Sequence, residues 1–343
     1  MRQRALLLLA CAFVTVAVVL ALLRGRGTPV GKQKQRAKWA FQPLTLPPGE
    51  AEDVAIRGDT ILVAMKSPRG GRVYRSRDGG RAWEPLDIAT SSGQWFALSP
   101  EFERDGTAVL VNAGEDVYLS RDSGDSWEKI SGWLNPRAIA LSPGENPAVY
   151  MATFRFGESH HLYIWEPNRG WELALEDSSP GTYGGFLQVL AFSSEEAILL
   201  VSHDTGGDWH TELWRTEDGW KSWSRGRGFP HDGVGEIVSA GEYGLVVPSA
   251  EGTLYYSPDR GMSWHPLAHL PEHPLSGLSG AGELLVASVD KDGETLLLRL
   301  EGQNWVELEG TPHISCCGIP LAVSPDELYI FATPRFLARG VRQ

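Results

Sequence analysis

Short apolar runs recur throughout the main body of the chain, separated by clusters of Gly, Pro, Asp, Asn and Ser. Runs of about five to eight residues bounded by turn-forming residues are typical of β-strands. One well-marked stretch predicts four successive strands, over Gln94–Pro100, Ala108–Ala113, Asp116–Ser120 and Trp127–Ser131. The 39 Gly, 22 Pro and 13 Trp agree with many short strands and tight turns, so the pattern predicts an all-β body.

A short motif repeats through this body. Four segments share the pattern Ser/Thr-x-Asp-x-Gly-x-x-Trp, although the third has Trp220 where the others have Gly. The residues that match are Ser76, Asp78, Gly80 and Trp83; Ser120, Asp122, Gly124 and Trp127; Thr216, Asp218 and Trp223; and Ser257, Asp259, Gly261 and Trp264. Two further copies keep only a turn and the Trp, at Trp171 and Trp305.

The motif has a structural explanation as a turn between two strands. Its Ser or Thr hydroxyl and its Asp carboxylate are suited to accept hydrogen bonds from backbone N–H groups of a tight turn. Gly adopts the positive φ that such a turn requires, and the Trp is expected to fill the gap between neighbouring sheets. The motif residues are therefore predicted to be structural and not catalytic.

The Trp residues recur at positions 39, 83, 127, 171, 223, 264 and 305, with spacings of 41 or 44 residues and one longer spacing of 52 between Trp171 and Trp223. This period fits one four-stranded blade of a β-propeller. After Trp305 three strands are expected, over Ile314–Asp326, Glu327–Arg335 and Phe336–Gln343, and Trp39–Leu46 would supply the fourth. The sequence thus predicts a seven-bladed, all-β propeller of four-stranded blades, closed by an N-terminal strand and preceded by one transmembrane helix.

The four motifs resemble the BNR/Asp-box repeat of sialidases, sortilin-type receptors, xyloglucan-cleaving hydrolases and photosystem II assembly factors. Phrases such as FALSPEFERDGTAVLV (Phe96–Val111) and AIALSPGENPAVYMA (Ala138–Ala152) are similar to exported bacterial members with this repeat. The resemblance covers residues 39–343 and implies the propeller architecture. It leaves function open, because the box is a structural turn in all of these families.

The N-terminus carries an apolar run of 19 residues without charge, Ala5–Leu23. As a helix it would rise about 28 Å, close to the thickness of a membrane core. The run is longer than the apolar part of a typical cleaved signal, so an uncleaved anchor is expected, with a cleaved signal as the alternative. The predicted organisation is an anchor or signal over 1–24, a basic linker over 25–38 and the propeller over 39–343.

Charge divides the chain in the same place. Of the 31 basic residues eight precede Trp39, so the rest of the chain carries 23 basic against 43 acidic residues, a net charge of about −20. Such an acidic body argues against nucleic acid as a partner. The basic flank alone would place the body in the cytoplasm. The resemblance to exported proteins instead favours an extracytoplasmic, membrane-anchored domain.

Catalytic chemistry is weakly indicated. A sialidase would need three Arg to clamp a carboxylate, and the candidates are Arg69, Arg72, Arg137 and Arg155. The Phe/Tyr-Arg-Ile-Pro signature that the resemblance would imply is absent from the sequence. Xyloglucan hydrolases use a cleft between two propellers, and one propeller does not form it. No catalytic residue is predicted, and a sialidase-like glycoside hydrolase remains the alternative function.

Binding of a protein, peptide or glycan is the preferred function. The loops expected to form the ligand face contain Trp133, Arg137, Tyr183, His203, Asp204, His231 and Asp232. A metal site built from the His of these loops, with His160, His161 and His210, is an alternative to solvated loop residues. Adjacent Cys316 and Cys317 point to opposite faces of a strand, so no metal or cofactor is predicted.

The membrane prediction has a direct test. Deleting residues 1–38 is expected to give a soluble, acidic, folded domain, because the only long apolar run of the sequence is removed. Membrane flotation of the full-length and shortened chains measures the difference. Continued flotation of the shortened chain would show that another part of the protein binds the membrane.

Overall fold

The structure is a computed structural model of the chain. It describes residues 38–343 except for positions 69, 89–93, 113–115, 133–135, 145, 154–159, 178–184, 205–208, 231–234 and 316–317. The apolar run Ala5–Leu23 lies outside this part. Within the described residues no helix has the length and apolarity needed to span a bilayer, and helical structure is limited to α1 (Phe102–Asp105) and the 3-10 turn η1 (Gly241–Tyr243).

The described residues form seven antiparallel sheets of four strands each. The first sheet contains β2 (Glu50–Arg57), β3 (Thr60–Ser67), β4 (Gly70–Ser76) and β5 (Glu84–Pro85), and the second β6 (Gln94–Leu98), β7 (Ala108–Asn112), β8 (Asp116–Ser120) and β9 (Glu128–Gly132). The third contains β10 (Pro136–Leu141), β11 (Val149–Thr153), β12 (His160–Glu166) and β13 (Gly170–Asp177), and the fourth β14 (Gly185–Ala191), β15 (Ala197–Asp204), β16 (Trp209–Thr216) and β17 (Ser224–Arg225). The fifth contains β18 (Val238–Ser239), β19 (Leu245–Pro248), β20 (Thr253–Ser257) and β21 (His265–His269), and the sixth β22 (Leu275–Ala281), β23 (Leu284–Lys291), β24 (Glu294–Glu301) and β25 (Asn304–Glu307). The seventh contains β26 (Ile319–Ser324), β27 (Glu327–Ala332), β28 (Phe336–Arg342) and β1 (Trp39–Pro43).

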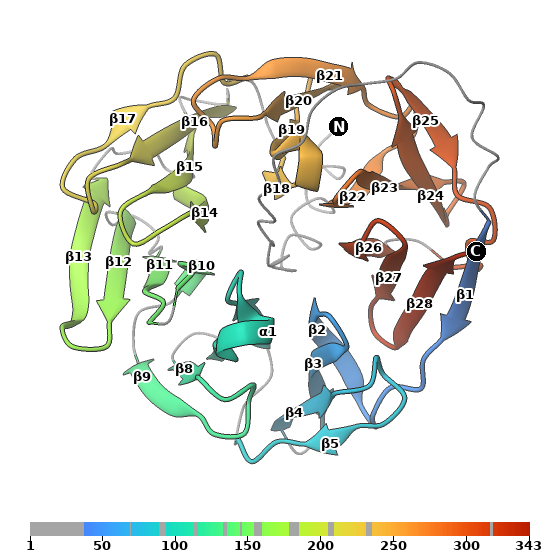
Figure 1. Ribbon diagram of the computed structural model, residues 1–343, viewed down its shortest axis with the longest axis horizontal. Coiled ribbons are helices and arrows are strands. Elements are labelled where there is room, and N and C mark those ends of the chain that lie inside the picture. The colour runs from blue at the N-terminus through green and yellow to red at the C-terminus, as the bar shows by residue number, and fades with distance from the viewer. Residues whose placement is uncertain are drawn as a thin grey trace.

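The sheets are arranged as blades around a central axis, with the first strand of each innermost and the fourth at the periphery (Figure 1). The seventh sheet is closed by β1, which pairs with β28 from Trp39 opposite Arg342 to Pro43 opposite Ala338. The prediction of a seven-bladed propeller closed by the N-terminal strand is therefore confirmed. Closure leaves no gap in the ring and pairs the edge of β28 that would otherwise be open.

Predicted strand boundaries were mostly right to within two residues, and the largest error lies before β26. The expected strand from Ile314 begins only at Ile319. Ile314 is instead buried against the sixth and seventh sheets, and its carbonyl accepts a hydrogen bond from the Thr295 N–H at 2.8 Å. The apolar character of Ile314 comes from this packing, which periodicity cannot distinguish from a strand.

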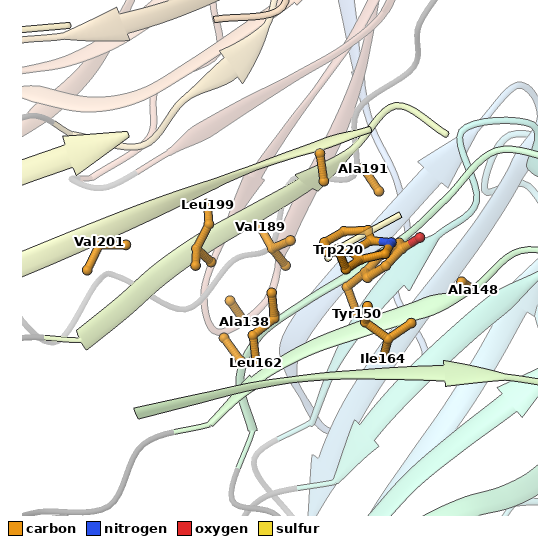
Figure 2. Packing of buried hydrophobic residues seen from close by; sticks show 12 residues of the cluster. Ala138, Ala148, Tyr150, Leu162, Ile164, Val189, Ala191, Leu199, Val201 and Trp220 are labelled. Atoms are coloured by element: carbon orange, nitrogen blue, oxygen red, sulfur yellow. The ribbon is translucent and has the colours of Figure 1, made fainter. Parts of the chain in front are cut away.

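The core consists of seven apolar clusters, one between each pair of neighbouring sheets in the described structure. Figure 2 shows the cluster between the third and fourth sheets, where Tyr150 and Leu162 face Val189 and Leu199. Each cluster contains one periodic Trp, which packs against the sheet before its own: Trp39, Trp83, Trp127, Trp171, Trp223, Trp264 and Trp305. The Trp period is thus the period of the interfaces between blades.

Three of these indoles also hydrogen-bond across the interface. Trp171 Nε1 donates to the carbonyl of Ile130 at 2.7 Å, and Trp305 Nε1 donates to that of His269 at 2.7 Å. Both acceptors lie on the outermost strand of the preceding sheet, and Trp83 Nε1 donates to the carbonyl just after β1, on Thr45, at 2.9 Å. These bonds fix the angle at which one blade meets the next.

Each complete motif forms one compact turn between the third and fourth strands. In the second sheet, Ser120 Oγ donates to Asp122 Oδ1 at 2.8 Å and accepts from the Gly124 N–H at 2.8 Å. Asp122 Oδ1 also accepts from the Ser126 N–H at 2.8 Å. The first, fourth and fifth sheets repeat this arrangement around Asp78, Asp218 and Asp259.

Trp220 occupies the glycine position of the third complete motif with a φ of 75°. The Trp220 side chain is accommodated there because it packs into the interface between the third and fourth sheets. The indole stacks on Tyr150 of the third sheet, with ring centroids 4.1 Å apart, and donates to the carbonyl of Ser194 at 2.8 Å. At Gly80, by contrast, an added Cβ would lie 2.6 Å from the Leu44 side chain. The interface between blades therefore decides which residue this turn accepts.

The packing predicts a ranking of two substitutions in one motif. Trp127→Ala should lower the free energy of unfolding by about 3–5 kcal/mol, because it leaves a cavity between the first and second sheets. Asp122→Ala should cost about 1–2 kcal/mol, because a tight turn loses its acceptor. Urea denaturation measures both. Glu307→Ala, on an exposed outer strand, is the control, and a larger loss for Asp122→Ala than for Trp127→Ala would contradict the ranking.

Candidate functional site

The two faces of the ring carry different parts of each blade. Consecutive strands run in opposite directions, so the turns between first and second strands and between third and fourth strands share one face. This is called the box face, because it carries the four complete motifs. The opposite face carries the starts of the innermost strands and the connections between second and third strands.

Arginines of the box face are used to join neighbouring blades. Arg75, whose side chain is only 2% exposed, precedes the first motif and donates to the Ser123 carbonyl in the motif of the next sheet. It also contacts Asp125 Oδ1 at 2.5 Å and Glu84 Oε1 at 2.7 Å. Because its donors are engaged within the protein, Arg75 is a structural residue.

Arg215 repeats this arrangement in the fourth sheet. Its guanidinium donates to the carbonyl of Arg260, in the motif of the fifth sheet, at 2.7 Å and to Glu196 Oε1 at 2.5 Å. Arg339 of the seventh sheet lies close to Gly79 of the first motif, since a Cβ on Gly79 would be 2.7 Å from Arg339 Nη1, and its Nε donates to Glu327 Oε1 at 2.6 Å. Three of the four motifs thus receive an arginine from the preceding blade.

The innermost strands of the opposite face are interrupted by β-bulges close to their starts. β2, β10, β14 and β22 each contain one such bulge, and the register shifts at Glu52, Arg137, Leu187 and Ser276 respectively. A bulge changes the direction of a side chain at the point where the strand begins. Arg137 is exposed, and Leu187 is 49% exposed, which is unusual for a leucine on an inner strand.

Glu236 occupies the corresponding region of the fifth sheet, two residues before β18. Together with Glu52, Arg137, Leu187 and Ser276 it is called the axial ring. Four of these residues lie on the inner strands β2, β10, β14 and β22, and Glu236 lies just before the inner strand β18; these strands surround the axis (Figure 1). The axial ring therefore combines acidic, basic, polar and apolar side chains at one end of the propeller.

Polar side chains just behind the axial ring tie one inner strand to the next. Gln188 Oε1 accepts from the Ile237 N–H at 2.9 Å, and Gln188 Nε2 donates to the Ile237 carbonyl at 2.8 Å. In the first sheet, Asp53 Oδ2 accepts from the Phe96 N–H at 2.7 Å. Burial raises the pKa of Asp53 well above its usual range, against the opposing effect of hydrogen bonds from Phe96 and Val54.

Glu236 is the titratable group of the axial ring with a displaced pKa. Its Oε1 lies 3.4 Å from Gln188 Nε2, and the residue is exposed to solvent. Burial by the surrounding protein nevertheless raises the pKa of Glu236 to about 7.

Of the residues predicted to bind ligand, Arg137 lies in the axial ring. His203 and Asp204 end β15, where their Cα atoms are paired with those of His210 and Trp209. The remaining four residues lie outside the described part of the chain: Trp133, Tyr183, His231 and Asp232. The backbone of His203 and Asp204 therefore lies on the same face of the ring as Arg137.

Of the histidines proposed as metal ligands, His203 and His210 are paired across β15 and β16, and His231 lies outside the described residues. His160 is buried at the start of β12, while His161 Nε2 lies 3.7 Å from Glu176 Oε1 and its ring contacts Tyr163. His313 Nδ1 lies 3.1 Å from Glu294 Oε2, and Cys316 and Cys317 are outside the described residues. Among the residues that are described, no group of three His, Cys, Asp or Glu side chains could hold a metal ion.

The sequence interpretation missed Glu52, Leu187, Gln188, Glu236 and Ser276. A signal was present for Gln188, which is the one polar side chain of the otherwise apolar strand β14 (Gly185–Ala191). What the sequence does not contain is the bulge, because an extra residue in a strand leaves the alternation of apolar and polar positions ambiguous.

The fold defines the protein as a seven-bladed β-propeller. No protein-family model and no curated relative matches its sequence. Among solved structures it is similar to YCF48 from Cyanidioschyzon merolae, with a TM-score of 0.57 and 15% identity over 88% of this chain and 98% of that one. It is also similar to the RRP9 WD40 repeats, with a TM-score of 0.60 and 11% identity over 89% and 98% of the two chains.

A third similar structure is the β-propeller domain of the Trilobed protease from Pyrococcus furiosus. Its TM-score is 0.55 and its identity 11%, over 83% of this chain and 97% of that one. That domain is described as having an open velcro topology, whereas β1 closes the ring here. At these identities the similarities show a shared fold and leave the function to the site.

The displaced pKa of Glu236 predicts how stability depends on pH. A carboxyl whose pKa is raised on folding stabilises the protein below the pKa of the unfolded state, about 4.3, and this contribution is lost as the pH rises through about 7. Glu236→Gln should therefore reduce the fall in melting temperature between pH 5 and pH 8. Thermal melts across this range, with Glu272→Gln as an exposed control, measure the effect; an unchanged fall in Glu236→Gln would contradict it.

Proposed function

We propose that the protein is a non-catalytic binding module that presents the axial ring and the surrounding loops to a protein or peptide ligand. The observation that carries the proposal is the difference between the two faces. Arg75 and Arg215 of the box face are committed to contacts between blades, while Arg137 and Leu187 of the axial ring are exposed at bulges. Function is concentrated where side chains are turned away from the core.

The chemistry of the axial ring suits a peptide better than a purely sugar ligand. Arg137 offers a cation, Glu52 and Glu236 offer carboxylates, and Leu187 offers an exposed apolar surface. Peptide ligands combine these same kinds of groups, and their anchors pack in apolar surroundings ringed by polar groups. The resemblance of the repeats to those of sortilin-type receptors and photosystem II assembly factors, which are non-enzymatic binders, supports the same function.

The proposal includes the repeat family and the location of the protein. The four complete motifs are assigned to the BNR/Asp-box repeat on their shared spacing and their shared hydrogen bonds around Asp78, Asp122, Asp218 and Asp259. The apolar run Ala5–Leu23 and the resemblance to exported proteins support a membrane-anchored, extracytoplasmic domain.

A peptide selection tests the binding function. A phage library of random peptides about twelve residues long is selected on the purified full-length chain, and the affinity of the enriched peptides is measured. Arg137→Glu/Leu187→Asp should weaken binding by at least about tenfold, a free energy of about 1.4 kcal/mol, because it reverses a charge and removes an apolar contact.

The matched control is Lys221→Glu/Met262→Asp, which makes the same two kinds of change on the box face, where Met262 is 54% exposed. It should bind peptides as the unmodified chain does. Loss of binding in the control and not in the axial-ring variant would place the ligand on the box face and sink the proposal. Release of sialic acid from a fluorogenic sialoside would instead support the glycoside hydrolase.

A further inference from the structure

The outer strand of the third blade differs from the other outer strands. β13 (Gly170–Asp177) is eight residues long and lies at the periphery of the ring (Figure 1). The other outer strands in the described structure have two to five residues: β5, β17, β25, β9, β21 and β1. An edge strand of this length is unusual, because proteins generally keep exposed edges short.

The outer edge of β13 is open. The strand pairs with β12 from Gly170 opposite Glu166 to Asp177 opposite His160, with one bulge at Ala174, between Leu173 and Leu175. Within the described residues no backbone hydrogen bond joins its other edge to another segment. The strand contains neither Pro nor Lys, which commonly block such edges. Alternate N–H and C=O groups along β13 are therefore available to a further strand.

The side chains of β13 indicate what such a strand would carry. Leu173 is 51% exposed and is one of few large apolar side chains on the described surface. Glu172 and Glu176 flank it and are 59% and 50% exposed. Trp171, in contrast, is turned inward and donates to the Ile130 carbonyl. Successive side chains of a strand point to opposite faces, so Glu172 lies on the other face of the strand from Leu173. Glu172 Oε1 is 3.9 Å from Arg169 Nε, and Glu176 Oε1 is 3.7 Å from His161 Nε2. The edge thus presents one apolar side chain and two exposed carboxylates close to it in the sequence.

We propose that β13 is a docking edge that takes an extended, basic segment of a partner protein as a fifth strand of the third sheet. Main-chain hydrogen bonds would supply the affinity and the side-chain pairs the specificity. The register follows from the strand: an apolar residue opposite Leu173 and Lys or Arg opposite Glu172 and Glu176. An antiparallel partner then reads Lys/Arg-x-x-apolar-Lys/Arg.

Charge selects this partner over a second copy of the chain. Two β13 edges paired with each other would bring Glu172 and Glu176 of both copies into one short sheet junction, and like charges across strands are destabilising. The propeller body is also strongly acidic, with 23 basic against 43 acidic residues after Lys38. The negative charge of the propeller body attracts a basic segment and repels a second copy of the chain.

The probe is a fluorescein-labelled peptide, Ser-Lys-Thr-Thr-Val-Lys-Ser, whose binding to the full-length chain is followed by fluorescence anisotropy. Binding should weaken by about tenfold or more in Glu172→Lys/Glu176→Lys and in Leu173→Ser. Glu307→Lys, a charge reversal on the exposed outer strand β25, is the matched control and should leave binding unchanged. Melting temperatures verify that all variants are folded.

Two further peptides test the backbone pairing. One peptide is N-methylated at the alternate amides whose N–H groups would face β13, and the other at the amides that would face away from it. Only the first peptide should lose binding. Equal binding of both peptides, or unchanged binding by Glu172→Lys/Glu176→Lys, would overturn the proposal. A dimer in sedimentation velocity that Leu173→Ser dissociates would overturn it in favour of a second copy. Arg137→Glu/Leu187→Asp should bind the probe normally, which separates this edge from the axial ring.

Discussion

The packing of each blade against the blade before it is the contact on which the rest of this structure depends. A four-stranded sheet of such short strands has too little buried surface to be stable alone, and the apolar core here lies between sheets and not within them. One Trp per period supplies the largest side chain of each interface, and Trp171 and Trp305 add a hydrogen bond to the outer strand of the preceding blade. Each blade is therefore stabilised by the blades on both of its sides. The pairing of β1 with β28 completes the seventh blade and so closes the ring.

The turn motifs belong to this same system of contacts. Each turn is held internally by its Ser or Thr and its Asp, but three of the four also receive an arginine from the preceding blade, through Arg75, Arg215 and Arg339. In the remaining one, Trp220 replaces both the glycine and the bridging contact by stacking on Tyr150. The motif is thus a connector between blades as well as a turn. Arg75 and Arg215 of this face are accordingly engaged in contacts between blades.

The opposite face is built differently, with bulges near the starts of several innermost strands. Bulges near the starts of β2, β10, β14 and β22 turn Glu52, Arg137, Leu187 and Ser276 away from the regular alternation. Side chains that do serve cohesion, such as Asp53 and Gln188, lie directly behind them. On β2 and β14, the side chain that joins neighbouring blades therefore directly follows the residue at the bulge. The long edge of β13 is a second, independent surface, set apart by its open backbone and by its carboxylates.

The sequence by itself determined the number of blades, the turn chemistry and the closure by the N-terminal strand. All three depend on local spacing: the Trp period reports the interfaces, the Ser/Thr and Asp positions report the turns, and the incomplete set of strands after Trp305 requires one more. Only the tertiary structure decided which polar residues face the axis, since a bulge shifts the alternation by one residue and cannot be read from hydropathy. Arg137 was found because it is charged, but Leu187 looks like a core residue and Glu236 like an ordinary loop carboxylate. Their exposure and pKa arise from segments distant in the sequence that surround the same axis, and that is a property of the closed ring.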